Sequence, residues 1–331
     1  MSDKTLIIQI PCFNEADTLG VTLAALPRAI EGFARVEWMV IDDGCSDDTV
    51  AVALAHGVDH IVRLEHNQGL ARAFAAGLEA AVRAGADVIV NTDADNQYCA
   101  DDIPKLTRPI LAGEADLVIG ARPIMATPHF SQTKKALQLL GSMVVRLASA
   151  TTVVDAPSGF RAFSRKAAQS LHVHGDYSYT LETIIAAGNQ HMAVTSVPIR
   201  TNPDLRPSRL VKSLPDYVLR SAGTIVRSFV TYRPLRFFVS IGALALFAGL
   251  CLGVRYLYLV AIGEGDGHVQ SVILSALLTG MGVLIALIGI VADLIAVNRR
   301  LLEKVLAQQQ ASAEAASARQ PQRRRTEASA A

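Results

Sequence analysis

Short apolar runs alternate with longer amphipathic stretches from residue 4 to about residue 120 of the chain. The runs are apolar enough to be covered on both faces, which is typical of strands buried in a parallel sheet. The stretches between them repeat their apolar positions at helical spacing, and several begin at Asp or Ser and end at Gly. This strict alternation predicts an α/β fold with a doubly wound, mostly parallel sheet. The expected strands span residues 5–10, 36–42, 58–64, 86–93 and 115–121, and the expected helices span 15–30, 46–57, 69–85 and 102–113.

The pattern is less regular from residue 122 to residue 232. We interpret this part as the acceptor side of the same domain and place the catalytic domain at residues 1–210. Its expected elements are a helix over 134–150, a loop over 155–163, a helix over 180–188 and a strand over 192–200.

Two long apolar stretches follow Pro234, at residues 235–263 and 269–297. Each is long enough to cross about 30 Å of hydrocarbon, so we predict a two-helix transmembrane hairpin over 234–298. Two buried helices of a soluble core are the alternative. Basic residues flank the hairpin on both sides, and the positive-inside rule places both ends in the cytoplasm. These residues are Arg227, Arg233 and Arg236 before the first span and Arg299, Arg300 and Lys304 after the second.

The segments on either side of the hairpin have different compositions. Residues 211–233 mix apolar, aromatic and basic side chains, which predicts amphipathic juxtamembrane helices in the membrane interface, with a solvated surface helix as the alternative. Residues 299–331 are of low complexity and predict a disordered cytoplasmic tail. We therefore expect a multi-pass protein of the cytoplasmic (inner) membrane, with the catalytic domain and both termini in the cytoplasm.

Charge and cysteine content exclude some classes of protein. The net charge is +1, and no basic stretch in the first half is interleaved with aromatic residues, so we expect no nucleic-acid partner. The four cysteines are scattered without a CxxC pair or metal-ligand spacing. Reduced thiols in a reducing compartment are the simplest interpretation, in agreement with a cytoplasmic catalytic domain.

Polar clusters follow three of the expected strands, at residues 11–15, 42–48 and 93–97. In open α/β sheets, ligands bind at the carboxyl ends of the strands. Asp93 and Asp95 bracket a tight turn and can converge on one hard divalent cation, and Gln97 can add an oxygen or hold a metal-bound water. A turn that only caps the following helix is the alternative.

Asp42 and Asp43, in a turn with Gly44, are suited to hydrogen-bonding a nucleoside. The sequence has neither a GxGxxG nor a GxxxxGK[ST] phosphate loop. A bound nucleoside diphosphate would therefore need a cation to neutralise its charge, and the Asp93 and Asp95 turn offers a place for that cation.

Six motifs, in order, are IPCFNE, IDDGCSDDT, HNQGLARAFAAGL, NTDADNQY, VIGAR and SGFRAF. Together they resemble the family 2 glycosyltransferases of the GT-A fold, and among these the dolichyl- and polyprenyl-phosphate sugar transferases. The resemblance covers residues 4 to 210. It implies inverting, metal-dependent transfer of a sugar from a nucleotide-sugar donor to a polyprenyl phosphate, and it is compatible with a homo-oligomer. It further implies that Pro11, Asn14 and Glu15, with Asp42 or Asp43, line the nucleoside pocket, and that Asp93, Asp95 and Gln97 hold Mg²⁺ or Mn²⁺ and the donor pyrophosphate.

The acceptor side needs cations more than it needs a base, because a phosphate monoester is already an anionic nucleophile at neutral pH. The resemblance supports Arg122 and the basic segment at residues 205–210 most, although Pro207 replaces a family glycine there. Every candidate cation named in the next sentence has an alternative role as one partner of a surface ion pair. The candidates that bring the two phosphates together are Arg122, Lys134, Lys135, Arg161, Arg206 and Arg209, with Ser208 as a hydroxyl donor, and we expect Asp95, Arg122, Arg206 and Arg209 to act in catalysis.

Two other functions remain open at this point. One is non-processive transfer to a different lipid acceptor. A processive synthase is disfavoured, because processive members of the superfamily carry a Gln/Arg-x-x-Arg-Trp element and the only tryptophan here, Trp38, lies in an expected strand. The other is a non-catalytic membrane scaffold that keeps the nucleotide-sugar fold. The presence of both Asp93 and Asp95 argues against the scaffold.

Overall fold

The structure is a computed structural model. It describes residues 3–123, 151–171, 179–203, 233–264 and 267–328, and single residues between 142 and 149 and between 222 and 230. The chain divides into two compact units, Met1–Val226 and Arg227–Ala331. Each unit is described by itself.

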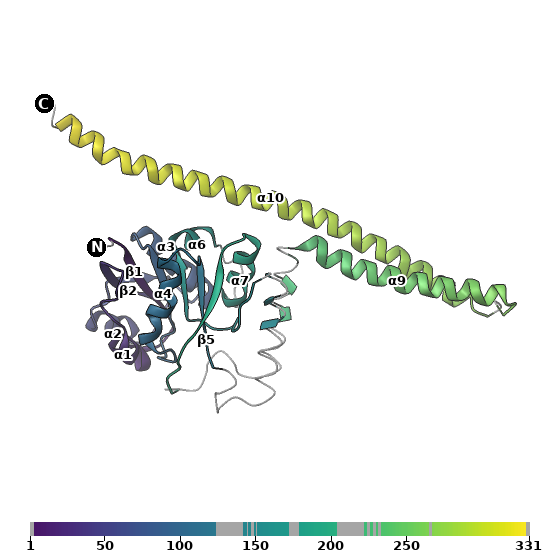
Figure 1. The fold of residues 1–331 in the computed structure, drawn as a ribbon, viewed down its shortest axis with the longest axis horizontal. Coiled ribbons are helices and arrows are strands. Elements are labelled where there is room, and N and C mark those ends of the chain that lie inside the picture. The colour runs from purple at the N-terminus through teal and green to yellow at the C-terminus, as the bar shows by residue number, and fades with distance from the viewer. Residues whose placement is uncertain are drawn as a thin grey trace. The chain divides into compact units, whose positions relative to one another are not determined.

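The first unit is built on a sheet with helices around it (Figure 1). The sheet has seven strands in the order β3-β2-β1-β4-β6-β5-β7. All its neighbours pair in parallel except β6, which runs antiparallel to both β4 and β5. This confirms the predicted α/β fold with a mostly parallel sheet. The strands are β1 (Thr5–Cys12), β2 (Arg35–Asp42), β3 (His60–Arg63), β4 (Val88–Asn91), β5 (Leu117–Ala121), β6 (Arg161–Ser164) and β7 (Val194–Pro198).

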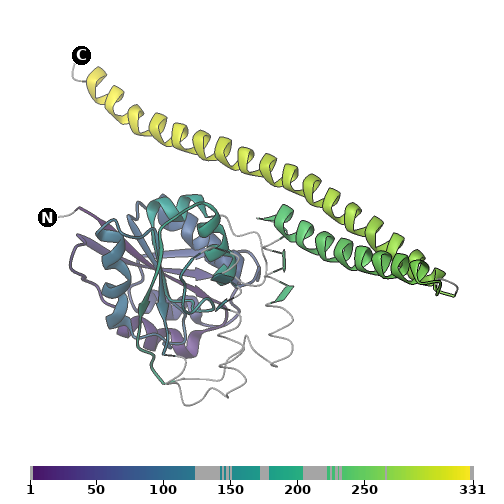
Figure 2. The same ribbon diagram turned by 45° about the vertical axis from the view of Figure 1, so that its right-hand side comes forward.

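Helices cover both faces of this sheet (Figure 2). On one face, Leu6, Ile8 and Ile10 of β1 share a buried cluster with Leu19 and Leu23 of the first helix. Alternate residues of the same strand point to the opposite face, as the two-residue repeat of a strand requires. The helices of the unit are α1 (Ala16–Ala25), α2 (Thr49–Ala55), α3 (Leu70–Arg83), α4 (Ile103–Leu111) after the short 3₁₀ helix η1 (Ala100–Asp102), α6 (Arg165–Ser170) and α7 (Tyr179–Asn189).

On the opposite face, α3 lies very close to the sheet at Gly77. A Cβ atom at this position would lie 2.6 Å from Gln9 Oε1 and 2.8 Å from Ile41 Cδ1. Phe74 on the same helix stacks on Tyr179 of α7, with ring centroids 3.9 Å apart. The absence of a side chain at Gly77 therefore lets α3 approach β1 and β2.

Two local expectations differ from the structure. Helix α1 ends at Ala25 rather than at residue 30, because Pro27 forces the preceding Leu26 out of the helical region, to φ −75° and ψ 137°. The first three residues of strand β6 lie in a segment expected to be a loop. The strand is only four residues long and is fixed by long-range pairing, with Arg161 opposite Asn91 and Ala162 opposite Val90.

The second unit contains two long helices, α9 (Pro234–Ala261) and α10 (Val269–Ala328). Residues 234–261 and 269–299 are long and apolar enough to cross a membrane, with mean hydropathies of 2.4 and 2.5. In the most apolar 18-residue stretch of each helix, only 11% and 17% of the residues are buried, whereas a helix in the core of a soluble protein is mostly buried. The buried-core alternative is thereby disfavoured.

The two helices pack closely through small residues. A Cβ atom at Gly242 would lie 2.7 Å from the carbonyl oxygen of Gly282, and one at Gly249 would lie 2.6 Å from Thr279 Oγ1. Ser275 Oγ donates a 2.7 Å hydrogen bond to the carbonyl oxygen of Gly249. Small residues of this kind are typical of helix pairs that pack backbone against backbone.

The predicted disordered tail is corrected by the structure, because α10 continues to Ala328. Alanine, glutamine, glutamate and arginine dominate this segment, and all four have high helix propensity, which outweighs the low complexity of the sequence. Most of the expected helix at 134–150 and of the juxtamembrane segment at 211–233 lies outside the described residues.

Candidate functional site

Three neighbouring strands end in polar residues at the same edge of the sheet. β1 lies between β2 and β4 and is parallel to both, with Cys12 opposite Asp42 and Gln9 opposite Asn91. Carboxyl ends of parallel strands therefore meet here. The structure brings together the three clusters that follow β1, β2 and β4.

Hydrogen bonds join the loop after β1 to the loop after β2, and the two loops together are called the rim. Asn14 adopts a left-handed conformation with φ 54°, and its Oδ1 accepts a 2.8 Å hydrogen bond from the backbone N–H of Ser46. The backbone N–H of Glu15 donates to Thr49 Oγ1 at 2.9 Å. Pro11 precedes this rim in the buried strand β1. The rim holds Asn14 and Glu15 beside the end of β2.

Asp42 and Asp43 have different environments. Asp43 is 2% exposed, and its two oxygens accept from the backbone N–H groups of Gln68 and Gly69 at 2.7 and 2.9 Å. Asp42 accepts one backbone hydrogen bond, from Cys45 at 2.7 Å. Asp43 therefore anchors the N-terminus of α3, and Asp42 is the better candidate for contacting a ligand.

Asp93 lies in a crowded and electrically unfavourable position. A Cβ atom at Gly159 would lie 3.0 Å from both carboxylate oxygens of Asp93. Burial, and then the negative charge of Asp95, raise the pKa of Asp93 to about 7, although the positive charge of Arg122 opposes the rise. The Asp95 carboxylate accepts a 3.1 Å hydrogen bond from the backbone N–H of Gln97. The turn thus concentrates more negative charge than its neighbours neutralise.

This charge surplus fits a divalent cation that is shared with a bound diphosphate. Hard cations such as Mg²⁺ and Mn²⁺ take carboxylate and phosphate oxygens, and Mg²⁺ commonly uses only one or two protein carboxylates with substrate phosphates and water. Within the part of the chain that the structure describes, no group of three or more His, Cys, Asp or Glu side chains could hold a metal. Asp93 and Asp95, with Gln97, therefore fit a site that the donor itself completes.

Arg122 follows β5 and is held by a buried carboxylate. Its Nε donates to Asp155 Oδ2 at 2.7 Å, and its Nη2 donates to Oδ1 at 3.1 Å. The Asp155 side chain is fully buried, and that of Arg122 is 14% exposed. Burial alone would lower the pKa of Arg122, but the phenol of Tyr98 and the carboxylate of Asp155 outweigh it, so the pKa is raised. Arg122 is a fixed, permanently charged group close enough to Asp93 to affect its pKa.

Arg161 was expected to contact the acceptor phosphate, and the structure corrects this prediction. The side chain is fully buried in β6. Burial lowers its pKa to about 10, so the guanidinium remains charged at neutral pH. Its donors are used internally: Nε donates to Ser158 O at 2.7 Å, Nη1 to Thr180 O and Thr183 Oγ1 at 2.7 Å each, and Nη2 to Ala156 O at 2.6 Å. Arg161 joins the loop before β6 to α7 from inside the core.

Lys134, Lys135, Arg206 and Arg209, together with Ser208, lie outside the described residues.

The structure adds residues that the sequence reasoning did not single out. Phe13 is 44% exposed between the buried end of β1 and Asn14. Tyr98 is buried, and its hydroxyl oxygen accepts a 2.9 Å hydrogen bond from the backbone N–H of Gly159. Phe13 and Tyr98 could have been found as the aromatic residues of the IPCFNE and NTDADNQY motifs, whereas Asp155 lies outside the six motifs.

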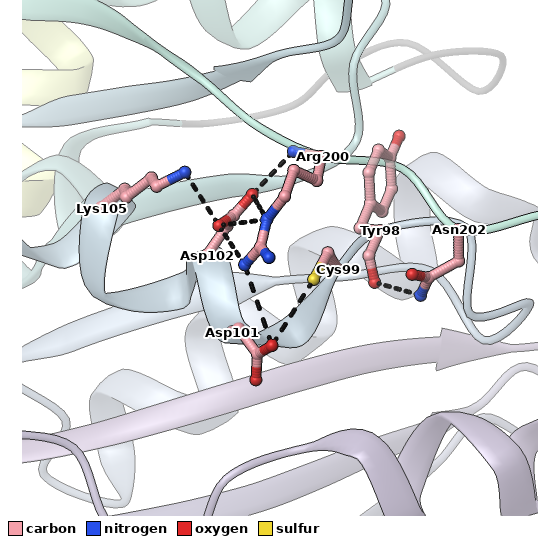
Figure 3. A network of polar contacts seen from close by, with 7 residues as sticks. All are labelled: Tyr98, Cys99, Asp101, Asp102, Lys105, Arg200 and Asn202. Atoms are coloured by element: carbon pink, nitrogen blue, oxygen red, sulfur yellow. Dashed lines mark hydrogen bonds and ion pairs between the residues drawn. The ribbon is translucent and has the colours of Figure 1, made fainter.

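A polar network joins the segment that follows the Asp93 and Asp95 turn to residues after β7 (Figure 3). Asp102 is fully buried and accepts hydrogen bonds from Arg200, from its backbone N–H at 2.6 Å and from Nη2 at 2.8 Å. Lys105 Nζ lies 2.9 Å from the same carboxylate. In the same network Asn202 Nδ2 donates to the carbonyl oxygen of Tyr98 at 3.3 Å. These hydrogen bonds hold the segment after β7 against the segment that follows Asp95.

An α/β fold whose strand ends carry an Asp-x-Asp turn, beside a second carboxylate at the end of β2, fits the class of nucleotide-sugar transferases. The family model described as "Glycosyl transferase family 2" matches residues 7–171. An uncharacterized glycosyltransferase of Mycobacterium tuberculosis is 30% identical over 205 residues, which cover 61% of this chain and 88% of that protein. The chain belongs to glycosyl transferase family 2 and has the GT-A fold.

Two further comparisons concern more specific proteins. The UDP-N-acetylglucosamine–dolichyl-phosphate N-acetylglucosaminyltransferase of Methanococcus voltae is 28% identical over 223 residues, covering 61% of this chain and 87% of that protein. Among solved structures, glucosyl-3-phosphoglycerate synthase from Mycobacterium tuberculosis, in complex with Mn²⁺ and UDP, superposes with a TM-score of 0.53. That match is 19% identical and covers 69% of this chain and 80% of the other, so it supports the fold alone.

Proposed function

We propose that this protein transfers a sugar from a nucleotide diphosphate sugar to a polyprenyl phosphate, such as undecaprenyl or dolichyl phosphate. The transfer inverts the anomeric configuration, depends on Mg²⁺ or Mn²⁺, and takes place at the cytoplasmic face of the membrane. The observation that carries this proposal is the Asp93 and Asp95 turn beside the fixed Arg122, on a chain that also has two exposed apolar helices.

The donor nucleoside binds at the rim formed by the loops after β1 and β2. Asp42 accepts hydrogen bonds from the nucleoside, and Pro11, Asn14 and Glu15 shape the pocket. Phe13 offers an exposed aromatic face at the same rim, and aromatic faces stack on bases of any kind. This arrangement favours a nucleotide but does not choose between uracil and guanine.

The donor diphosphate binds at the turn that holds Asp93, Asp95 and Gln97. A divalent cation held by these residues would neutralise the charge of the diphosphate and make the diphosphate a better leaving group. The protein contributes two carboxylates in fixed positions, since Asp93 packs against Gly159 and Asp95 is bonded to the backbone of Gln97.

The acceptor phosphate is the nucleophile, and no side chain has to remove a proton from it. One of its oxygens attacks the anomeric carbon, the bond from that carbon to the diphosphate breaks, and the nucleoside diphosphate leaves with the electron pair. Arg122 attracts the incoming phosphate and holds it near the donor, because its charge and orientation are fixed by Asp155. The further cations proposed for this role are Lys134, Lys135, Arg206 and Arg209, with Ser208 as a hydroxyl donor.

The two apolar helices would bring the enzyme to its lipid substrate. We propose that α9 and α10 form a transmembrane hairpin with its flanking arginines in the cytoplasm. The charged residues within the helices are compatible with this arrangement. Gly289 of α10 packs on Phe238 of α9, so Asp293, one helical turn further along α10, lies near the level at which α9 begins. Arg255 lies within two turns of the end of α9.

The experiment that tests this function is radiolabel transfer to undecaprenyl phosphate by the purified full chain. UDP-glucose, UDP-N-acetylglucosamine and GDP-mannose are compared as donors, each with Mn²⁺ or EDTA. We expect lipid product from at least one donor with Mn²⁺, none with EDTA, and none from Asp95→Asn. Glu79→Gln removes an exposed carboxylate on α3 that is not among the proposed site residues, and it should leave activity unchanged.

Each alternative predicts a different outcome. Transfer only to another lipid, such as diacylglycerol, would keep the donor site and replace the acceptor. Lack of both transfer and metal-dependent nucleotide binding would support a non-catalytic scaffold instead.

A further inference from the structure

The turn that carries Asp95 and Gln97 has an unusual backbone. Asn96, between them, adopts a left-handed conformation with φ 55°. Asparagine tolerates this conformation better than most non-glycine residues, and here it reverses the direction of the chain between two proposed ligands. The directions of the Asp95 and Gln97 side chains follow from the peptide planes on either side of Asn96. Whatever fixes those planes therefore fixes the proposed metal ligands.

Asn202 is the residue that contacts these planes. Its Nδ2 donates to the carbonyl oxygens of Asn96 and Tyr98 at 2.9 and 3.3 Å, and its backbone N–H donates to the carbonyl oxygen of Gln97 at 2.8 Å. One residue, more than a hundred positions later in the sequence, thus satisfies three consecutive carbonyl groups of the turn. These bonds set the rotation of each peptide plane directly.

Asn202 is itself held in register by its neighbours. Thr201 forms an antiparallel bridge with Tyr98, and the backbone N–H of Cys99 donates to the carbonyl oxygen of Arg200 at 3.3 Å. Arg200 is held by the buried carboxylate of Asp102, whose Oδ2 accepts from Nε at 3.3 Å and whose Oδ1 accepts from Nη2 at 2.8 Å (Figure 3). A buried carboxylate with bidentate arginine geometry resists sliding of one segment along the other.

We propose that Asn202 is a positioning residue for the metal and diphosphate site, acting through the backbone of residues 96–98 and held in place by the Asp102–Arg200 pair. Asn202 contacts neither substrate nor metal in this role. The inference rests on the proposed function of the Asp93 and Asp95 turn. Residues of this kind behind metal ligands typically change metal affinity or activity by roughly 10- to 100-fold.

The test is nucleotide binding, measured by calorimetry on the full chain, with UDP and GDP as probes in Mn²⁺ or in EDTA. Asn202→Ala removes both side-chain hydrogen bonds to the turn and keeps the backbone bond to Gln97. We expect it to weaken Mn²⁺-dependent binding by roughly tenfold or more. Metal-free binding should be unchanged, because the rim around Asp42 is untouched. In the transfer assay, the Mn²⁺ concentration for half-maximal rate should rise.

Asn189→Ala is the matched control. Asn189 is partly buried at the end of α7, in the same unit but outside the proposed site. Arg200→Gln is a second variant, which loses the guanidinium contacts and keeps the backbone bond to Asp102. It should shift Mn²⁺-dependent binding in the same direction as Asn202→Ala.

The outcomes separate this inference from the proposed function. Unchanged Mn²⁺-dependent binding in Asn202→Ala and Arg200→Gln overturns the positioning role. So does an equal loss of metal-free binding, or an equal loss in Asn189→Ala, because either would indicate general destabilisation. If the wild type binds Mn²⁺ and nucleotide but transfers no sugar to polyprenyl phosphate, the function fails and the positioning role stands. If the wild type binds no nucleotide with Mn²⁺, both fail.

Discussion

Replacing Arg161 with methionine tests whether this residue belongs to the core, as the structure indicates, or to the acceptor site. The guanidinium donates to three backbone carbonyls, of Ser158, Thr180 and Ala156. The change leaves these carbonyls buried without that donor, at a cost of about 1–3 kcal/mol each. It also removes a buried charge. With its pKa lowered to about 10, that charge costs about 3 kcal/mol in the folded state. Taking about 2 kcal/mol for each carbonyl, the net loss of stability is about 3 kcal/mol.

A loss of this size should lower the midpoint of thermal unfolding by roughly 6–12 °C for a unit of about 200 residues. The single tryptophan, Trp38, is buried in β2, so its fluorescence reports the unfolding of the first unit in the full chain. Arg83→Met is the control. Arg83 is 65% exposed and pairs only with Glu79 among the described residues, and its loss should change stability by no more than about 0.5 kcal/mol. An Arg161→Met protein that unfolds like the wild type but has a raised KM for the lipid acceptor would refute this reasoning.

Three other predictions follow from single contacts. Phe13→Ala should weaken nucleotide binding by about 1–3 kcal/mol, the usual value of base stacking, with or without metal; unchanged affinity in calorimetry would exclude stacking. Gly249→Leu should disrupt the packing of α9 on α10, because its Cβ would meet Thr279. Gly280→Leu should not, because the space around Gly280 is open. Equal thermal stability of the two variants in detergent would contradict this packing. Burial acts to raise the pKa of Asp102, but hydrogen bonds from Arg200 outweigh burial and lower the pKa. The ionised carboxylate therefore stabilises the fold above about pH 4, and this stabilisation is lost as the pH falls further. Asp102→Asn should therefore be less stable than the wild type at pH 7, and the difference should shrink towards pH 3.

The fold was predictable from the sequence wherever the signal is local. Strands β1, β2 and β4 are mostly apolar runs, and the polar clusters that follow them lie together because parallel neighbours end at the same edge. The short strand β6 was missed, because its four residues form a strand only by pairing between β4 and β5. Such long-range pairing leaves little trace in the sequence of the segment itself.

The site was predictable in residue type more than in role. Asp93 and Asp95 were found from their spacing, but the sequence could not distinguish Asp42 from Asp43, whose oxygens are bound to the N-terminus of α3. Arg161 was assigned to the acceptor as one of the cations in the six motifs, because an acceptor phosphate needs positive charge. Its burial depends on α7, which supplies two of its acceptors from far along the chain. Asn202 gave no sequence signal, since its partners are backbone carbonyls and any residue has these.

The central claim is that the anionic phosphate of a polyprenyl lipid is the nucleophile. The most direct measurement compares undecaprenyl phosphate with undecaprenol as acceptors for the full chain, using the same donor and Mn²⁺, and determines the anomeric configuration of the product. We predict transfer to the phosphate alone, giving a mild-acid-labile lipid with the configuration opposite to that of the donor. Equal transfer to undecaprenol, or a product that retains the donor configuration, would contradict the account.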